Sequence, residues 1–285
     1  MSSGLRAWLA QSELLAYNAV RRDRWIAQQA ALVPSGTKVL DVGAGSCPYR
    51  ALFAHCDYRT QDLAPLRGDQ LRYGGYGALD FVSDVTAIPV PDGSFGMVLC
   101  TEVLEHHPEP IRVVHELARI LQPGGTLILT APLGSGIHQE PYHYYGGYTP
   151  WWYERFLKAA GFEDINIEPN EGSFRFFGQE SIRFIQTTSP WSTSLPVGIR
   201  LLWLPMWIVL FPILGLVVPV LCKWLDRFDR ERRFTVGYHV TARRAGSSLC
   251  HENLMRMGRA CLRRPGARRR SRVREFSSCP TPFGT

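Results

Sequence analysis

The chain has 285 residues, of which 45% are hydrophobic, and it carries a formal net charge of +7 at pH 7. This length predicts one large domain with appendages, and the composition is sufficient for a packed core. The charge is uneven, because residues 246–285 contain nine Arg and two Glu while the rest of the chain is neutral. The seven cysteines form no CxxC pair and no Cys/His group at metal-ligand spacing. We therefore expect reduced cytosolic thiols, with no disulfide framework and no metal site.

Residues 1–34 are predicted to be a helical segment that ends at Pro34-Ser35-Gly36. They contain no uninterrupted apolar run before a cleavage site, so they indicate an amphipathic helix rather than a signal peptide. From Thr37 onward, short apolar runs alternate with helical patterns. The expected strands are TKVLDVG, YRTQDL, LDFVSD, MVLCTEV and GTLILTAP, and CPYRALFAH is helical in pattern. This alternation predicts a parallel sheet covered by helices, within a main domain over 35–245.

The second half of the main domain begins with the clearest helical pattern, over 108–121. A further helix is expected over 150–160, followed by a strand over 162–168. Regular patterns break at 170–195, which is polar and aromatic, and they return in a strand over 235–244.

Beyond the main domain, residues 246–285 are Arg-, Ser- and Gly-rich with little periodicity, which predicts a disordered basic tail. The tail has no interleaved aromatic residues and no known binding motif, so nucleic acid is not an expected partner.

The segment VLDVGAGSCP, residues 39–48, predicts a buried strand that leads into a glycine turn and then a helix. Glycines allow a tight turn and a close approach of a ligand, and the following helix N-terminus offers free N–H groups. The sixth position of a GxGxxG fingerprint is Pro48, which makes an NAD-dependent oxidoreductase the weaker alternative. Asp62 ends the second strand, where it could accept both ribose hydroxyls, and Asp84 ends the third, where it could bind an adenine amino group.

The chain resembles the class I S-adenosylmethionine-dependent methyltransferases, in particular the type 11 methyltransferase domain. The segments that carry the resemblance are DVGAGSCPY at 41–49, the acid at 62, DVTAIPVPDGSFGMVLCTEVLEHHPEP at 84–110 and ELARILQPGGTLILTAP at 116–132. One departure is Cys47, where that family usually has a third glycine, and it is expected to place side-chain bulk beside the methionine end of the cofactor. The resemblance covers about residues 35–170.

The resemblance implies a Rossmann-like seven-stranded sheet in the order 3-2-1-4-5-7-6, with S-adenosyl-L-methionine as cofactor. It places the glycine turn on the methionine moiety, Asp62 on the ribose, and Thr101 with Glu102 under the sulfonium. The implied cofactor-binding residues are Asp41, Gly43, Ala44, Gly45, Asp62, Asp84, Val85, Thr101 and Glu102.

The family does not dictate a catalytic residue, because a base is needed only where the acceptor must lose a proton. Residues 136–145 gather two His, one Glu and three Tyr after the fifth strand, at the edge where open α/β sheets bind ligands. His138 and His143 are the candidate bases, and the alternative is a loop that only covers the pocket. His106 is interpreted as structural and His107 as a solvated residue at a helix start.

Residues 201–222 contain no charged group and are long enough to cross a bilayer. A single crossing conflicts with the fold, because strands before and after the insert must pair in one sheet. Pro205, Pro212 and Pro219 recur every seven residues, which suggests that the insert over 197–223 re-enters as two short halves or lies along the surface. A buried helical cap or a dimer interface is the alternative.

The resemblance implies a methyltransferase, and together with the apolar insert it predicts one that acts on a small-molecule or lipid acceptor. We expect a cytoplasmic protein held at the cytoplasmic face of a membrane through 197–223. The alternative is a cofactor-binding scaffold on the same fold without turnover.

Overall fold

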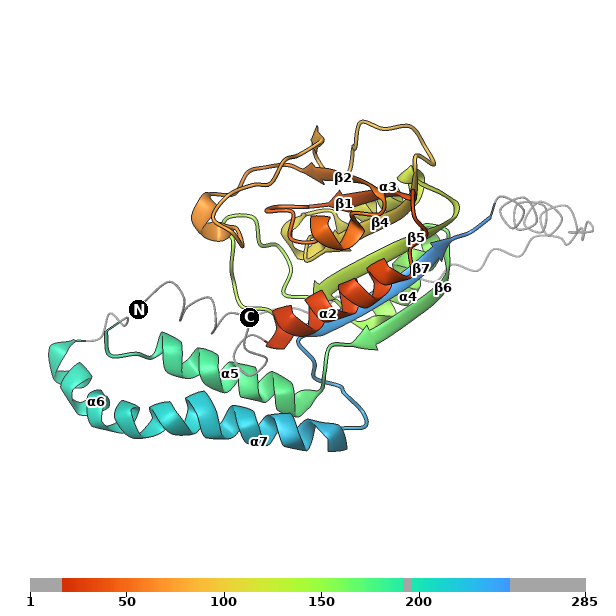
Figure 1. Ribbon diagram of the computed structural model, residues 1–285. Helices are drawn as coiled ribbons and strands as arrows, with labels where there is room; N and C mark the ends of the chain where they lie inside the picture. The colour runs from red at the N-terminus through yellow and green to blue at the C-terminus, as the bar shows by residue number, and fades with distance from the viewer. Residues whose placement is uncertain (1–16, 192–195, 247–285) are drawn as a thin grey trace, which may run out of the picture. The chain divides into compact units, whose positions relative to one another are not determined.

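The computed structural model describes residues 17–191 and 196–246. Within them, seven strands form one sheet in the order β3-β2-β1-β4-β5-β7-β6, which confirms the expected order (Figure 1). The strands are β1 (Lys38–Val42), β2 (Asp57–Asp62), β3 (Phe81–Val82), β4 (Phe95–Thr101), β5 (Leu121–Pro132), β6 (Phe162–Pro169) and β7 (Gly237–Arg244). Strands β1 to β5 pair in parallel, whereas β7 is antiparallel to both β5 and β6.

Helices cover both faces of the sheet, because side chains alternate along each strand and buried strands are apolar on both faces. Helix α2 (Tyr17–Ala31) packs Trp25 and Ile26 on one face. Helices α3 (Pro110–Ile120) and α4 (Pro150–Ala159) cover the other, around Leu117 and Tyr153. The first part of the predicted N-terminal helix and the basic tail lie outside the described residues.

The segment CPYRALFAH forms only a short 3₁₀ turn, η1 (Arg50–Phe53), so the prediction of a regular helix there was wrong. Residues Gly43 to Tyr49 form the loop after β1. Too few residues then remain before β2 for more than a single turn of helix. The other short turns are η2 (Gly68–Gln70), η3 (Leu104–His106) and η5 (Asp226–Phe228).

Two antiparallel helical limbs, which we name the arm (residues 173–228), leave the sheet between β6 and β7 (Figure 1). The outgoing limb is α5 (Ser173–Thr187), where the sequence patterns predicted no regular structure. The returning limb is α6 (Val197–Pro212), the π-turn η4 (Ile213–Val217) and α7 (Val218–Leu225). Gly178 allows the limbs to approach, because a Cβ there would lie 3.1 Å from the Cβ of Cys222.

The returning limb is one continuous helix, Val197–Phe228, so the prediction of two short re-entrant halves was wrong. Pro205 and Pro212 lie inside it without ending it. The π-turn that follows Pro212 is the place where the regular α-helical hydrogen-bond pattern changes. Because that helix is continuous, the two ends of the insert lie at its opposite ends, so the expectation that both ends lie on one side was also wrong. The antiparallel partner that brings the chain back to the sheet is α5, which comes before the insert. This helix is long and apolar enough to cross a membrane, and its apolar window of 18 residues has a mean hydropathy of 2.4 and no buried residue. Cys222 and Asp226, at the end nearer the sheet, are buried.

Candidate active site

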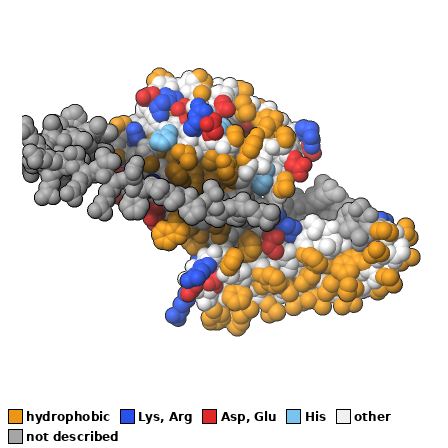
Figure 2. All heavy atoms as spheres, turned by 180° about the vertical axis from the view of Figure 1, so that it is seen from behind, with side chains coloured by type: hydrophobic (Ala, Val, Ile, Leu, Met, Phe, Trp, Pro, Cys, Tyr) orange, Lys and Arg blue, Asp and Glu red, His pale blue; other side chains and the backbone are white. Residues whose placement is uncertain are grey.

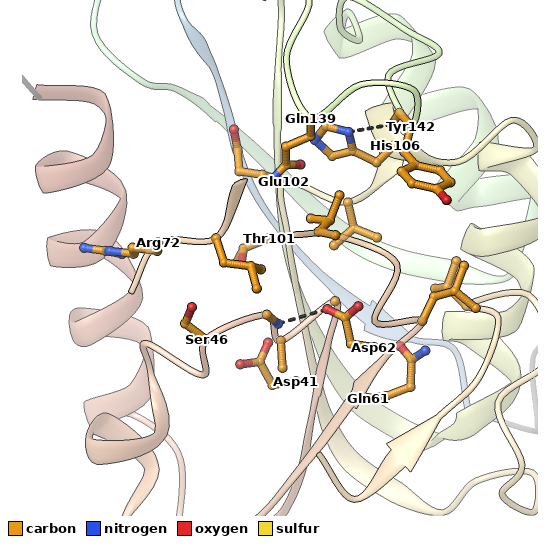
Figure 3. Close-up of a pocket in the computed structure, with 18 of the residues that line it drawn as sticks. Asp41, Ser46, Gln61, Asp62, Arg72, Thr101, Glu102, His106, Gln139 and Tyr142 are labelled. Atoms are coloured by element: carbon orange, nitrogen blue, oxygen red, sulfur yellow. Dashed lines mark hydrogen bonds between the residues drawn. The ribbon is translucent and has the colours of Figure 1, made fainter. Parts of the chain in front are cut away.

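A cavity of about 260 Å³ opens at the carboxyl ends of β1, β2 and β4 (Figure 3). This is the edge where doubly wound sheets bind ligands. All nine residues that the resemblance implies for the cofactor line it: Asp41, Gly43, Ala44, Gly45, Asp62, Asp84, Val85, Thr101 and Glu102. Residues from the loop after β5 and from α2 complete the wall, which makes this cavity the candidate site.

The glycine turn after β1 has the conformation that its residues predict. Gly43 and Gly45 have φ angles of +67° and +50°, which favour glycine. A Cβ on Gly43 would lie 2.3 Å from Cγ2 of Val103, so this position has no room for a side chain. The backbone of the turn therefore forms the floor of the cavity.

Asp62 lies at the end of β2 and points into the cavity (Figure 3). Its Oδ2 accepts a hydrogen bond from the Gly45 amide at 2.9 Å, and its Oδ1 accepts one from the Ala64 amide at 2.7 Å. These bonds fix the carboxylate, and each oxygen keeps a lone pair that could accept from a ligand hydroxyl. The position suits a ribose.

Asp84 is held by its own loop and by a histidine. Its Oδ1 accepts from the amide and the hydroxyl of Thr86, at 2.7 and 2.6 Å. Nε2 of His107 lies 3.4 Å away. Burial raises the pKa of Asp84, but the bonds from Thr86 and the nearby His107 outweigh it, so the net shift is downward. His107 therefore lines the cavity beside Asp84, and the prediction of a solvated side chain was wrong.

Asp41 is a buried carboxyl with one unsatisfied oxygen. Tyr58 donates a short hydrogen bond to its Oδ2, but Oδ1 has no partner among the described residues. Burial raises the pKa of Asp41 to about 7, although the Tyr58 bond lowers it. An ammonium group in the cavity would supply the missing donor, and S-adenosylmethionine carries one on its methionine part. The carboxylate acceptors Asp62 and Asp41 therefore fit this cofactor at its ribose and at its amino acid end.

Glu102 carries a second negative charge into the cavity, in a left-handed backbone conformation with φ of +54°. Its carboxylate accepts from the Thr130 hydroxyl at 2.8 Å and pairs with Arg22 of α2 at 3.2 Å. Sequence patterns did not indicate Arg22 as a site residue, because nothing in the helix α2 predicts that it reaches the sheet edge. The ion pair leaves Glu102 fixed beside Thr101, facing the ligand space (Figure 3).

The two predicted catalytic histidines lie near the cavity but do not line it. His138 is exposed, and its Nδ1 is 2.9 Å from the Gly136 carbonyl oxygen. His143 is half-buried, and its Nε2 is 3.0 Å from the Ser135 hydroxyl. Their loop reaches the cavity through Gln139 and Tyr142 instead.

His106 connects this loop to the cavity. It lines the cavity wall, and its ring centroid lies 4.8 Å from that of His138 and 5.7 Å from that of His143. Burial is the largest effect on His106 and lowers its pKa to about 4. The fold also places it against Glu105, and this grouping of distant ligand-type side chains is not visible in sequence spacing.

Cys47, at the position of the missing third glycine, adopts a φ of +52°. Its side chain faces Gly77, where a Cβ would lie only 2.4 Å from the Cys47 sulfur. The expectation that Cys47 adds bulk at the methionine end was wrong, because its side chain lies outside the candidate cavity.

The strand order and the cavity define a Rossmann-like domain that binds an adenosyl cofactor. Residues 40–129 match the family model of a methyltransferase domain, and the cofactor of such a domain is S-adenosylmethionine.

Curated and solved proteins are also similar to this chain. A ubiquinone biosynthesis O-methyltransferase from Xanthomonas campestris pv. campestris is 36% identical over 129 residues, which cover 42% of this chain and 52% of the relative. An uncharacterized methyltransferase from Mycobacterium sp. is 32% identical over 139 residues, covering 45% and 53%. A solved SAM-dependent methyltransferase from Archaeoglobus fulgidus is 13% identical, with a TM-score of 0.46, and covers 84% of this chain and 99% of its own. The matched region spans about half the length of the curated relatives.

Proposed function

We propose that the protein transfers a methyl group from S-adenosylmethionine to an oxygen atom of a small amphipathic acceptor. The observation that carries the proposal is the convergence of nine expected cofactor residues on one cavity. The names of the relatives, O-methyltransferases of ubiquinone biosynthesis, favour oxygen as the acceptor atom.

The cavity residues would act mainly by binding and positioning. S-adenosylmethionine supplies an activated methyl group on a sulfonium. Asp62 would hold the ribose hydroxyls, Asp41 the ammonium group, and Glu102 would place negative charge near the sulfonium. Holding the acceptor oxygen in line with the methyl group can account for much of the rate, because orientation alone contributes large effective molarities.

The loop with His138 and His143 would serve the acceptor. It lies over the cavity through Gln139 and Tyr142, and a hydroxyl acceptor must lose a proton during transfer. The arm lies next to this loop, because a Cβ on Gly136 would be 3.0 Å from a guanidinium nitrogen of Arg183. An acceptor that comes from the arm side would therefore meet the histidines first.

The arm would bind the cytoplasmic face of a membrane through the insert 197–223 and bring the active site to a lipid-like acceptor. Figure 2 shows hydrophobic side chains gathered along this part of the molecule. Large apolar residues are exposed there: Val197, Ile199, Leu201, Leu202, Met206, Ile208, Val209, Phe211, Ile213, Leu216, Val217, Val220 and Leu221. A contiguous apolar surface of this kind marks a protein or membrane contact.

Asp62→Ala tests the proposed function at the cofactor. The change leaves the ribose hydroxyls without an acceptor, at a cost of about 1–3 kcal/mol. Calorimetry should show S-adenosylmethionine binding at least tenfold weaker than for the wild type. Asp57→Ala, an exposed carboxylate at the other end of β2, is the matched control and should bind normally. Equal binding by wild type and Asp62→Ala would exclude the ribose role, and no binding by either protein would contradict the proposed function.

A further inference from the structure

A group of metal-ligand side chains adjoins the cofactor cavity. Single ligand atoms of Glu105, His106 and His138 lie within 4.8 Å of one another. His143 packs beside them, with its ring centroid 4.6 Å from that of His138. Glu105 and His106 follow β4, whereas His138 comes from the loop after β5, beyond the segment that matches the methyltransferase domain family.

Two of the histidines are oriented as metal ligands usually are. The Nδ1 atoms of His106 and His138 lie 2.7 and 2.9 Å from the carbonyl oxygens of Tyr142 and Gly136. A carbonyl only accepts, so each Nδ1 must carry the proton, which leaves Nε2 with its lone pair available. Metal-binding histidines commonly donate their second ring nitrogen in this way.

Glu105 is a buried carboxyl group whose oxygens lack hydrogen-bond partners, as expected for a residue that binds a cation. Its side chain is fully buried, and neither carboxyl oxygen has a hydrogen-bond partner among the described residues. Nε2 of His106 lies 3.7 Å from its Oε1, too far for a hydrogen bond. A buried polar group without a partner is costly, and a bound cation would satisfy it.

We propose that Glu105, His106 and His138 bind a divalent transition-metal ion, with Zn²⁺ as the representative case. Two imidazoles and one carboxylate suit zinc or a similar ion better than Mg²⁺ or Ca²⁺, and three protein ligands leave an open position. Zinc bonds of about 2 Å need a small closure of these side chains, which the exposed position of His138 permits.

The open position would bind the acceptor hydroxyl, a consequence that rests on the proposed function. The metal would lower the pKa of that hydroxyl, as it does for bound water. The acceptor oxygen then forms its bond to the methyl carbon as the sulfur–carbon bond breaks. The hydroxyl proton passes to the solvent, and the cofactor leaves as a neutral thioether. His138 would then act as a metal ligand rather than as a base.

The test uses the full chain, stripped with a chelator, and Zn²⁺ or Co²⁺ alone as the probe. We expect one tightly bound ion per chain by calorimetry, and a visible Co²⁺ absorption that reports nitrogen ligands. His138→Ala and His106→Ala should each weaken binding at least tenfold. His115→Ala, an exposed histidine on α3, is the matched control and should bind as the wild type.

Absence of binding by the wild type, or equal binding by the wild type and both histidine variants, would overturn the metal site. His138 is an exposed loop residue, so a loss of binding in His138→Ala cannot be attributed to a failure to fold. Asp62→Ala should lose cofactor affinity yet keep the metal. Methylation at the wild-type rate by the stripped chain would reject the metal's role in the reaction while leaving the proposed function intact.

Discussion

At the scale of single residues, some side chains of the cavity are held in place by hydrogen bonds, and some carry polar atoms without a partner. Asp62 accepts one hydrogen bond from Gly45 of the glycine turn and one from Ala64 of its own loop, so its direction is set before any ligand arrives. Asp41, buried and only half satisfied, is the clearest electrostatic cost in the site. A site that is prepared to bind a cation commonly stores such a cost, because the ligand then recovers it on binding.

The raised pKa of Asp41 predicts how the stability of the ligand-free protein depends on pH. The pKa is about 7 in the folded state and about 3.9 in an unfolded chain, so folding takes up a proton between these values. The contribution of Asp41 is therefore fully present below pH 4 and is lost as the pH rises through 7. The loss is at most about 4 kcal/mol at 1.36 kcal/mol per pKa unit.

Urea unfolding of the wild type and of Asp41→Asn from pH 4 to 8 measures this effect. The free energy of unfolding of the wild type should fall relative to that of the variant as the pH rises. Asp57→Asn, which changes an exposed carboxylate, should follow the wild-type profile. Parallel curves for the wild type and Asp41→Asn would show that Asp41 titrates normally.

At the scale of elements, the start of the outgoing limb of the arm is bonded to side chains at the end of the returning limb. Helix α5 begins after Gly172 and has no N-cap side chain of its own. Asp226, 54 residues later than Gly172, accepts from the amides of Gly172 and Arg175 at 2.9 and 2.8 Å. Asp229 accepts from the Ser173 amide at 2.7 Å. The first turn of α5 therefore depends on the returning limb, because unpaired amides at a helix start are unfavourable.

Asp226→Ala should loosen the base of the arm. The variant leaves the amides of Gly172, just before α5, and of Arg175, in its first turn, without acceptors, at a cost of about 2 kcal/mol. Hydrogen exchange should become faster in the first turn of α5 and stay unchanged in α3. Glu231→Ala, which removes an exposed carboxylate paired with Arg233, should leave exchange in α5 as it is. Wild-type exchange in α5 of Asp226→Ala would contradict the capping role.

At the scale of the molecule, a methyltransferase domain carries a long apolar helix that is not part of its core. Strand β6 ends and β7 begins at the same edge of the sheet as the cofactor cavity, because β7 runs antiparallel to its neighbours. The arm, inserted between them, therefore leaves the domain on the active-site edge. This placement is the physical basis for proposing that membrane contact and acceptor binding occur together.

Polar substitutions on the arm should abolish membrane binding without unfolding the domain. The triple variant Leu202→Gln, Val209→Gln and Leu216→Gln replaces side chains that are 80%, 60% and 54% exposed. Burial of such side chains is worth about 1.5–3 kcal/mol each, so flotation with anionic vesicles should decrease at least tenfold. Binding by the wild type should resist high salt.

A matched control replaces exposed apolar residues away from the arm, Leu32→Gln, Val82→Gln and Trp151→Gln. It should float with vesicles as the wild type does. Equal flotation of the wild type and the arm variant, or no flotation of the wild type, would reject the membrane role.

The sequence by itself determined the sheet and its cofactor edge. Alternating and helical patterns, ended by Pro and Gly, identify most strands and both α3 and α4, because local periodicity follows directly from which face is buried. Asp62 and Asp84 could be placed because each follows a strand, and parallel strands bring their carboxyl ends to one edge. The resemblance added the strand order, which the structure confirms.

Only the tertiary structure decided the rest, because contacts between distant segments carry no local pattern. Helix α5 is stabilised by caps from Asp226 and by the returning limb, so its own sequence is an incomplete signal. Arg22 reaches Glu102 through the packing of α2 on the sheet. His106 meets His138 only when the loop after β5 folds back over β4. Residue spacing cannot show these pairs, since they form only when distant segments pack together and burial offsets the entropy cost of closing the chain between them.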